Sequence, residues 1–436
     1  MSLPVISLIA LTIAVLISCF TPLNIGTLSL GLSFIVGVLM GGQKLKDVIA
    51  GYPTSLFLTL AGVTYLFAIA QVNGTLDKIT KYTIKSVKGK VALLPIVLFF
   101  LAFILASIGP GHIAIAALLA SPVMLLAEEV GIPPLLMALV VGNGAQAGAM
   151  SPIAPTGVIA KDILNKMPLG MGNTGVILWM NMLFTHMAVA ALAYVLYGGL
   201  KLFKNQNTAS IKALENIKVE PLDNKQWMTV GAIVLLIVAV IIGGFYPKQF
   251  PFDVGFGAFI LGAALALLGA GDEGKAIKAM PWGTILMVTG VSVLVNLMSK
   301  IGGMDLFADI MTRFSTPVTV TLVVGFISAV ISAYASTSGV IFPAILPLAP
   351  VLLAKLGVVN NYPALLALVS TIVVAGHLTD MSPLSTTGAV FIAQAGPKTD
   401  KNAIFRGMMI WGLSMAVVGA VLCWVLFGLI RLPWMV

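Results

Sequence analysis

Two short stretches rich in serine, threonine, proline and glycine interrupt apolar runs at corresponding places in the two halves of the chain. One is residues 151–157 (SPIAPTG) and the other is residues 382–388 (SPLSTTG). Serine followed by proline is typical of a helix N-cap and the first helical residue. We therefore expect a half-helix to begin at Ser151 and another at Ser382. Each would present unpaired N–H groups and the positive end of the helix dipole.

Two further interruptions lie inside unusually long apolar runs. Residues 107–112 (SIGPGH) divide the run 91–126, and residues 336–339 (STSG) divide the run 317–354. Four helix N-termini that converge at one depth would bind an anion through backbone N–H groups and hydroxyls, without an arginine. The alternatives are proline kinks that ease packing and hydroxyls that bond to the preceding turn.

The candidate anion ligands are the glycine, proline, hydroxyl and histidine residues of these interruptions. They are Ser107, Gly109, Gly111, His112, Ser151, Pro152, Thr156, Ser336, Thr337, Ser338, Ser382, Pro383, Thr386 and Thr387. His112 follows a turn and would be a neutral hydrogen-bond donor or a satisfied core histidine.

A cation site is expected beside the anion site. Asp380 would lie at the negative C-terminal end of a half-helix, where a carboxylate is costly without a cation or a proton. The alternative is that Asp380 caps the next half-helix. The candidate cation ligands are Ser107, Asn143, Gln146, Thr337, Thr379 and Asp380.

Composition places these interruptions in a membrane. Of 436 residues, 59% are hydrophobic and 9% are charged, and the mean hydropathy is +1.08. A soluble protein carries about 25% charged residues, so soluble enzymes, nucleic-acid binders and disordered chains are excluded. No metalloprotease, P-loop or hydrolase motif is present in the required context, and we expect neither an enzyme nor a cofactor. The chain is predicted to be an all-α polytopic membrane protein.

The halves repeat one another. Gly62-Val63-Thr64 recurs as Gly290-Val291-Ser292, and residues 151–157 recur as 382–388, at offsets of about 230 residues. We predict a first repeat at 1–199, with a hairpin at about 91–126 and a broken helix at about 133–160. A linker at 200–226 follows. The second repeat is 227–436, with a hairpin at about 317–354 and a broken helix at about 362–395.

If each hairpin is re-entrant, each repeat crosses the membrane five times and the second repeat is inverted. With this odd number of crossings, 15 of the 24 lysine and arginine residues lie on the same side of the membrane as the linker. The positive-inside rule then makes the linker cytoplasmic and puts both termini outside a plasma (inner) membrane. The excess of basic residues, net +9, is interpreted as loop charge facing anionic lipid rather than nucleic acid.

Residues 49–75 and 144–153 resemble the MatC-type malonate/dicarboxylate carriers of the ion transporter superfamily, which are related to the divalent anion/sodium symporters. The resemblance implies a homodimer whose protomers have a scaffold domain, formed by the first two runs of each half, and a transport domain that moves as an elevator. In the symporters the hairpin tips carry a Ser-Asn-Thr motif. Here the matching tips are Ser107-Ile108-Gly109 and Ser336-Thr337-Ser338, without the asparagine.

The expected function is secondary active transport of a small, malonate-like dicarboxylate. Two negative charges that move inward each cost about 2.3 kcal/mol per 100 mV, so transport needs a coupled cation. We expect this cation to be Na⁺, with H⁺ as the second choice. The alternative is a cation/proton antiporter of the same superfamily with its ion site at Asp380.

Overall fold

The computed structural model describes residues 2–21, 23–203, 219–246 and 248–435, and within these ranges it contains helices and no strands. Eight of the described helical segments are long and apolar enough to cross a membrane, and five shorter apolar helices accompany them. The predicted all-α polytopic fold class is confirmed.

The described part of the first half contains ten α-helices. They are α1 (Leu3–Phe20), α2 (Ile25–Ser33), α3 (Leu45–Ile49), α4 (Thr54–Val72), α5 (Thr75–Ser86), α6 (Leu94–Ser107), α7 (Gly111–Val130), α8 (Pro134–Gly148), α9 (Pro155–Leu164) and α10 (Gly175–Leu196). Short 3₁₀ or π segments extend several of them, including η1 (Phe34–Met40), η2 (Val91–Leu93), η3 (Pro168–Thr174) and η4 (Gly199–Phe203).

The described part of the second half has the same order of elements. It comprises α12 (Asn224–Phe245), α13 (Val254–Leu267), α14 (Glu273–Ala279), α15 (Trp282–Lys300), α16 (Gly303–Thr312), α17 (Val320–Ser332), η5 (Thr337–Ile341), α18 (Phe342–Ile345), α19 (Leu348–Lys355), α20 (Tyr362–Thr379), α21 (Thr386–Ala393), α22 (Lys401–Cys423), η6 (Trp424–Ile430) and η7 (Pro433–Met435).

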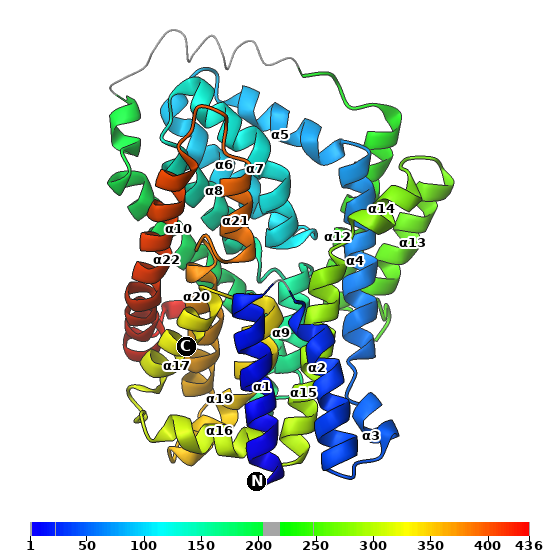
Figure 1. Ribbon diagram of the computed structural model, residues 1–436. Coiled ribbons are helices and arrows are strands. Elements are labelled where there is room, and N and C mark those ends of the chain that lie inside the picture. Colours follow the sequence, from blue (N-terminus) through cyan, green and yellow to red (C-terminus); the bar gives the residue numbers. More distant parts are fainter. Residues whose placement is uncertain (1, 22, 204–218, 247, 436) are drawn as a thin grey trace.

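Both expected hairpins are present as pairs of antiparallel arms. The pair α6–α7 lies in the upper half of the molecule, and the pair formed by α17 with η5, α18 and α19 lies in the lower half (Figure 1). The hairpins therefore extend from opposite ends, as an inverted repeat requires, although the inverted repeat in the membrane stays a prediction. The second returning arm is divided into three pieces, because Pro343 and Pro347 each remove a backbone donor from the helix.

The repeated Gly-Val-Thr/Ser motif marks two equivalent helix crossings. A Cβ atom added at Gly62 on α4 would collide with the backbone of Gly255 on α13. A Cβ atom added at Gly290 on α15 would collide with the backbone of Gly26 on α2. Small residues let membrane helices approach until their backbones touch. The motif therefore repeats because each half contributes one such crossing to the other half.

Two amphipathic helices were not predicted as separate elements. The helices α5 and α16 both begin after a glycine with a left-handed backbone, Gly74 (φ 77°) and Gly302 (φ 81°). Glycine adopts this conformation without steric cost. The helix α5 crosses the top of the view in Figure 1, and α16 crosses the bottom.

The helices form two groups by their contacts. One group contains α1, α2, α4, α12, α13 and α15, in which α4 packs against α13 and α2 packs against α15. The other contains the hairpins, the broken helices, α10 and α22. The third apolar run of each half, α4 or α15, thus packs with the first two runs that were predicted to form the scaffold.

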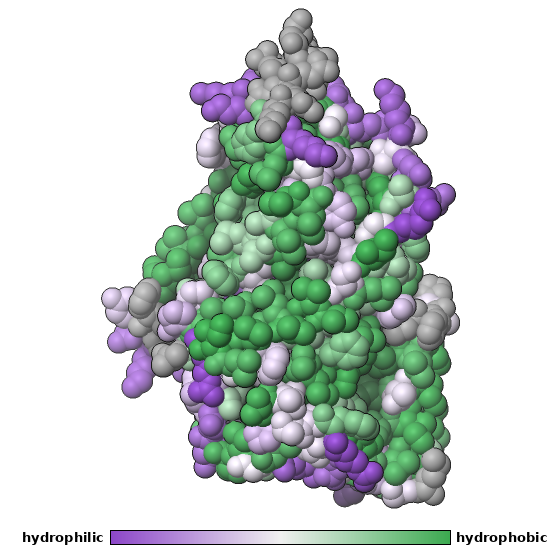
Figure 2. Space-filling view, turned by 90° about the vertical axis from the view of Figure 1, so that its left-hand side faces the viewer, coloured by the Kyte–Doolittle hydropathy of each residue, from purple (hydrophilic) through white to green (hydrophobic). Residues whose placement is uncertain are grey.

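Hydrophobic and hydrophilic residues lie in different parts of the molecular surface. Hydrophobic residues dominate the middle of the face in Figure 2, and hydrophilic residues gather at its top and bottom. Both termini lie in the lower half of Figure 1, and the lysine-bearing helices α5 and α14 lie in the upper half. This arrangement agrees with the predicted sorting of basic residues. Most of the predicted linker, at 200–226, lies outside the described residues.

Candidate functional site

The four interruptions meet in the interior of the molecule. His112, at the start of α7, lies with Nδ1 3.3 Å from Oγ1 of Thr156 in the first turn of α9. The ring of His112 also packs edge-on against the ring of His377 on α20, with 5.4 Å between centroids. The first hairpin therefore contacts the broken helix of its own half and that of the other half.

Asp380 links the second broken helix to the second hairpin. It is the C-cap residue of α20 and is 3% exposed. Its Oδ1 accepts a hydrogen bond of 2.7 Å from the Ser332 hydroxyl at the end of α17. The Ser332 hydroxyl is also 2.5 Å from Oγ1 of Thr337 at the hairpin tip. Thr337 and Gln146 also face this carboxylate.

Gln146 joins the first broken helix to the second. Its Nε2 donates a hydrogen bond of 3.2 Å to Oγ1 of Thr387 in the first turn of α21. Its Oε1 is buried without a hydrogen-bond partner. We call the side chains that meet here the central cluster; its members are His112, Gln146, Thr156, Ser332, Thr337, His377, Asp380 and Thr387.

Two of the expected cation ligands are engaged elsewhere. Oδ1 of Asn143 accepts a hydrogen bond of 2.8 Å from Nδ1 of His186, and Nδ2 of Asn143 donates to the Leu139 carbonyl oxygen. The Thr379 hydroxyl donates to the carbonyl oxygens of Ala329 and Gly376. Of the expected set, the structure brings together Gln146, Thr337 and Asp380.

The first hairpin tip is tightly packed. A Cβ atom added at Gly109 would collide with the Phe67 ring of α4, and one added at Gly111 would lie 3.0 Å from Cδ of Pro155. Gly111 has a φ of 79°, which glycine adopts readily. The Ser107 hydroxyl is buried and has no hydrogen-bond partner among the described residues.

The second hairpin tip is capped by its own serine. The Ser336 hydroxyl accepts a hydrogen bond of 3.2 Å from the Gly339 N–H and lies 3.4 Å from the Ser338 hydroxyl. Both serines and Thr337 are at most 9% exposed. Ser336 is therefore a helix cap, while Thr337 is the tip residue that reaches Asp380.

The second half-helices begin later than the sequence predicts. The helix α9 begins at Pro155, after the extended residue Ala154, and α21 begins at Thr386. Ser385 caps α21 by accepting a hydrogen bond from the Gly388 N–H. The prediction that Ser151 and Ser382 cap the half-helices is therefore wrong.

The reason lies in a turn that follows each first half-helix. The Ala154 N–H donates to the Ser151 carbonyl oxygen, and the Ser385 N–H donates to that of Ser382. The Ser-Pro pair of each half, which contains Pro152 or Pro383, therefore lies in this turn and not in a helix. Within these breaks, Ser151, Ser382 and Pro383 are buried, Pro152 is partly exposed, and Thr386 is exposed.

The glycine that ends each repeated motif permits this turn. A Cβ atom added at Gly157 would collide with the Ser151 carbonyl oxygen, and one added at Gly388 would collide with that of Ser382. The start of each second half-helix therefore packs directly on the end of the turn before it.

Crevices flank α9 on both sides. One, of about 440 Å³, is lined by Pro152 and Ile153 of the break and by residues of α4, α12 and α13. The other, of about 280 Å³, lies between α9, α15, α18 and α19. Asp162 on α9 lines both crevices.

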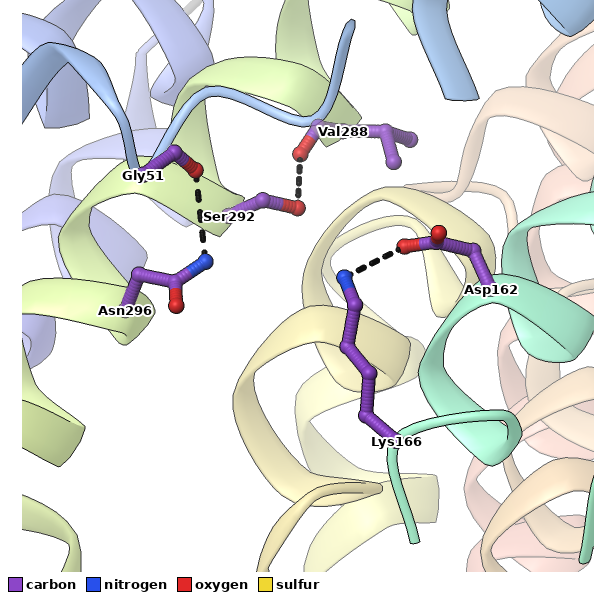
Figure 3. A network of polar contacts seen from close by, with 6 residues as sticks. All are labelled: Gly51, Asp162, Lys166, Val288, Ser292 and Asn296. Atoms are coloured by element: carbon purple, nitrogen blue, oxygen red, sulfur yellow. Dashed lines mark hydrogen bonds and ion pairs between the residues drawn. The ribbon is translucent and has the colours of Figure 1, made fainter. Parts of the chain in front are cut away.

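Figure 3 shows the second crevice from close by. Lys166 and Asp162 form an ion pair of 2.8 Å on one wall, and Ser292 and Asn296 of α15 lie on the opposite wall. The Asn296 amide donates to the Gly51 carbonyl oxygen, and the Ser292 hydroxyl donates to that of Val288. The boundary between the two helix groups is therefore polar at this place.

Sequence reasoning missed three polar residues near the site. Ser332 lies in an apolar helix with no proline or glycine beside it. His377 lies three residues before Asp380 in an apolar run, and Ser385 follows the more prominent Ser-Pro pair. The sequence contains one signal for the Ser385 cap. Ser385 precedes Gly388 by three residues, which is the spacing between an N-cap residue and the N–H group that it binds.

Comparison with known proteins agrees with this architecture. Residues 1–149 match the family model of the dicarboxylate carrier protein MatC N-terminus. No curated protein is a match for the chain. The crystal structure of the Alcanivorax borkumensis YdaH transporter has a similar fold, with a TM-score of 0.55, 14% sequence identity, and coverage of 89% of this chain and 88% of that one. The chain is thus a multi-pass membrane protein whose fold is similar to that of the YdaH transporter, and its resemblance to the MatC-type dicarboxylate carriers is confirmed over residues 1–149.

Proposed function

We propose that this protein is a secondary active transporter for a small, malonate-like dicarboxylate. The observation that carries the proposal is the meeting of four helix interruptions in a chain whose first 149 residues match the MatC N-terminal region. Helix N-termini stabilise anions through backbone N–H groups and the helix dipole. The central cluster contains no arginine or lysine, so these groups and the hydroxyls bind the carboxylates.

Transport is coupled to a cation. Each negative charge that enters against the membrane potential costs about 2.3 kcal/mol per 100 mV, and a dicarboxylate carries two. The Asp380 carboxylate and the Thr337 hydroxyl both contact the Ser332 hydroxyl, and oxygen ligands of this kind suit Na⁺. Sodium is therefore the first choice for the coupled ion, and H⁺ is the second.

The transport movement is an elevator motion of the hairpin group against the scaffold group. The two crevices along α9 support this, because they lie where the hairpin group meets α4, α12, α13 and α15. The protein works as a homodimer in the plasma (inner) membrane, with a cytoplasmic linker and both termini outside. The homodimer rests on the family resemblance, and the orientation rests on the distribution of lysine and arginine.

A cation/proton antiporter is the second candidate. Asp380 is buried and accepts a hydrogen bond from Ser332, and such a carboxylate could exchange one cation for another without an organic substrate. Uptake of radiolabelled malonate distinguishes the two candidates. A symporter accumulates malonate in proteoliposomes under an inward Na⁺ gradient, whereas an antiporter moves only cations.

A matched pair of threonine variants tests the site itself. Thr337 and Thr289 are both fully buried, but the Thr289 hydroxyl donates only to carbonyl oxygens of its own helix, α15. Thr337→Ala should lower malonate uptake by about tenfold or more, because a hydrogen bond to a charged group contributes roughly 1.5–3 kcal/mol. Thr289→Ala should transport at close to the wild-type rate. Equal uptake by both variants would remove Thr337 from the site.

A further inference from the structure

We propose that His112, His377 and Asp380 form a binding site for a divalent transition-metal ion, and that a carboxylate of the transported substrate completes its coordination. The second clause rests on the proposed function; the metal site does not. The three residues come from the start of α7, the end of α20 and the C-cap of α20. All three are at most 3% exposed.

The donor atoms are close enough for one ion. One ligand atom from each residue lies within 4.8 Å of the other two. One position therefore lies within about 2.8 Å (4.8 Å divided by √3) of all three donor atoms. Zinc-type ions bind imidazole nitrogen and carboxylate oxygen at about 2.0–2.2 Å. Each donor therefore needs to move by less than about 1 Å.

The outer hydrogen bonds orient these side chains as metal ligands. Histidine that binds a metal through one ring nitrogen generally donates the other N–H to a carbonyl, a carboxylate or a water. Nδ1 of His377 lies 2.7 Å from the Val373 carbonyl oxygen, so it carries the proton and donates it. Nε2 of His377 is then an acceptor, and it is buried without a partner. Asp380 is held in turn by the Ser332 hydroxyl.

His186 shows that burial alone does not define the site. Its Nδ1 is 2.8 Å from Asn143, and its Nε2 is also buried without a partner. It nevertheless lies outside the group whose donor atoms converge. His186 therefore serves as a matched control, with the same residue type and burial but no place among the ligands.

The chemistry of the donors selects the class of ion. Two imidazoles and one carboxylate suit Zn²⁺, Co²⁺ and similar ions, whereas Ca²⁺ and Mg²⁺ take oxygen ligands. Three protein ligands leave at least one coordination position open. A dication that crosses the membrane together with the dicarboxylate, in place of Na⁺, would cancel its two charges, and the pair would then move without electrical cost.

Binding of Co²⁺ to the purified protein tests the site, because coordination gives visible d–d absorption bands. The wild type should bind one Co²⁺ and show these bands. His377→Ala and His112→Ala should weaken Co²⁺ binding by about 100-fold or more, while His186→Ala should change it less than about twofold. A wild-type protein that gives no bands, or equal affinities in all three variants, overturns the site.

Malonate gives the second readout. The absorption bands of the bound Co²⁺ should shift when malonate is added, and saturating malonate should strengthen Co²⁺ binding by the same factor by which Co²⁺ strengthens malonate binding. Unchanged bands would overturn the role of the substrate as a ligand. Malonate uptake measured in parallel separates the two proposals, since uptake without Co²⁺ binding contradicts only the metal site, and Co²⁺ binding without uptake contradicts only the proposed function.

Discussion

The repeated glycines Gly157 and Gly388 offer a sharp test of the broken helices. A Cβ atom at Gly157 would lie 2.9 Å from the Met150 carbonyl oxygen and nearer still to that of Ser151. A Cβ atom at Gly388 would meet the carbonyl oxygens of Met381 and Ser382 in the same way. Backbone oxygens cannot rotate aside, so the start of the second half-helix must move.

The size of the effect follows from two opposing contributions. Overpacking costs roughly 1–3 kcal/mol, and contact with backbone places these positions at the upper end of that range. Alanine in place of glycine returns about 1 kcal/mol of helix propensity. The net cost is about 2 kcal/mol, which corresponds to about 30-fold in kcat/KM if it falls on the binding of the transported anion.

Initial rates of malonate uptake into proteoliposomes measure this loss. Gly31→Ala is the control, because Gly31 lies in α2 and a Cβ atom there meets nothing within 4 Å. We expect Gly157→Ala and Gly388→Ala to lose uptake, while Gly31→Ala keeps it and is stabilised slightly. Wild-type uptake by Gly157→Ala and Gly388→Ala would refute the assignment of the half-helix starts to the substrate site.

Two other predictions concern the crossing helices and the crevice. Gly62→Leu should prevent α4 from packing on α13, so that size-exclusion chromatography shows no folded, monodisperse protein. Gly31→Leu places its side chain in open space and should fold. A monodisperse Gly62→Leu protein would contradict the crossing. Lys166→Ala should leave the thermal unfolding temperature nearly unchanged, because an ion pair that is 62% and 27% exposed contributes at most about 1 kcal/mol. It should raise the KM for malonate severalfold at low ionic strength and not in 1 M choline chloride, which screens charges beyond about 3 Å; an effect independent of salt would exclude recruitment of the anion by this lysine.

The sequence predicts the positions of the breaks because proline, glycine and serine stand out against apolar runs. Each of the four interruptions, at 107–112, 151–157, 336–339 and 382–388, overlaps a non-helical break between two helices, at 108–110, 149–154, 333–336 and 380–385 respectively. Their equivalent places in the two halves indicated that they belong to one site. The contacts among His112, Thr156 and His377 agree with that expectation.

The sequence does not predict which polar side chains face one another. Ser332 resembles any other serine in an apolar helix until the fold places it beside Asp380. Asn143 and Thr379 have suitable chemistry, but their nearest partners are His186 and backbone carbonyls. A helix rotates each successive residue by about 100°, so spacing in the chain does not show which side chains meet across helices.

The sequence also does not predict the residue at which each second half-helix begins. Each break contains two candidate starts, one at the Ser-Pro pair and one three or four residues later, and both have suitable residues. The turn that closes on Ser151 and on Ser382 decides between them. It depends on the contact between Gly157 or Gly388 and the backbone before it, which is a feature of the folded chain alone.

A cryo-electron microscopy map of the protein with malonate would test the central claim most directly. We predict density for the dicarboxylate in contact with the first turns of α7, α9 and α21 and with the hairpin tip at Thr337. Density for malonate at the surface of the protein with none beside Thr337, or a continuous helix through Ser151 or Ser382, would contradict it.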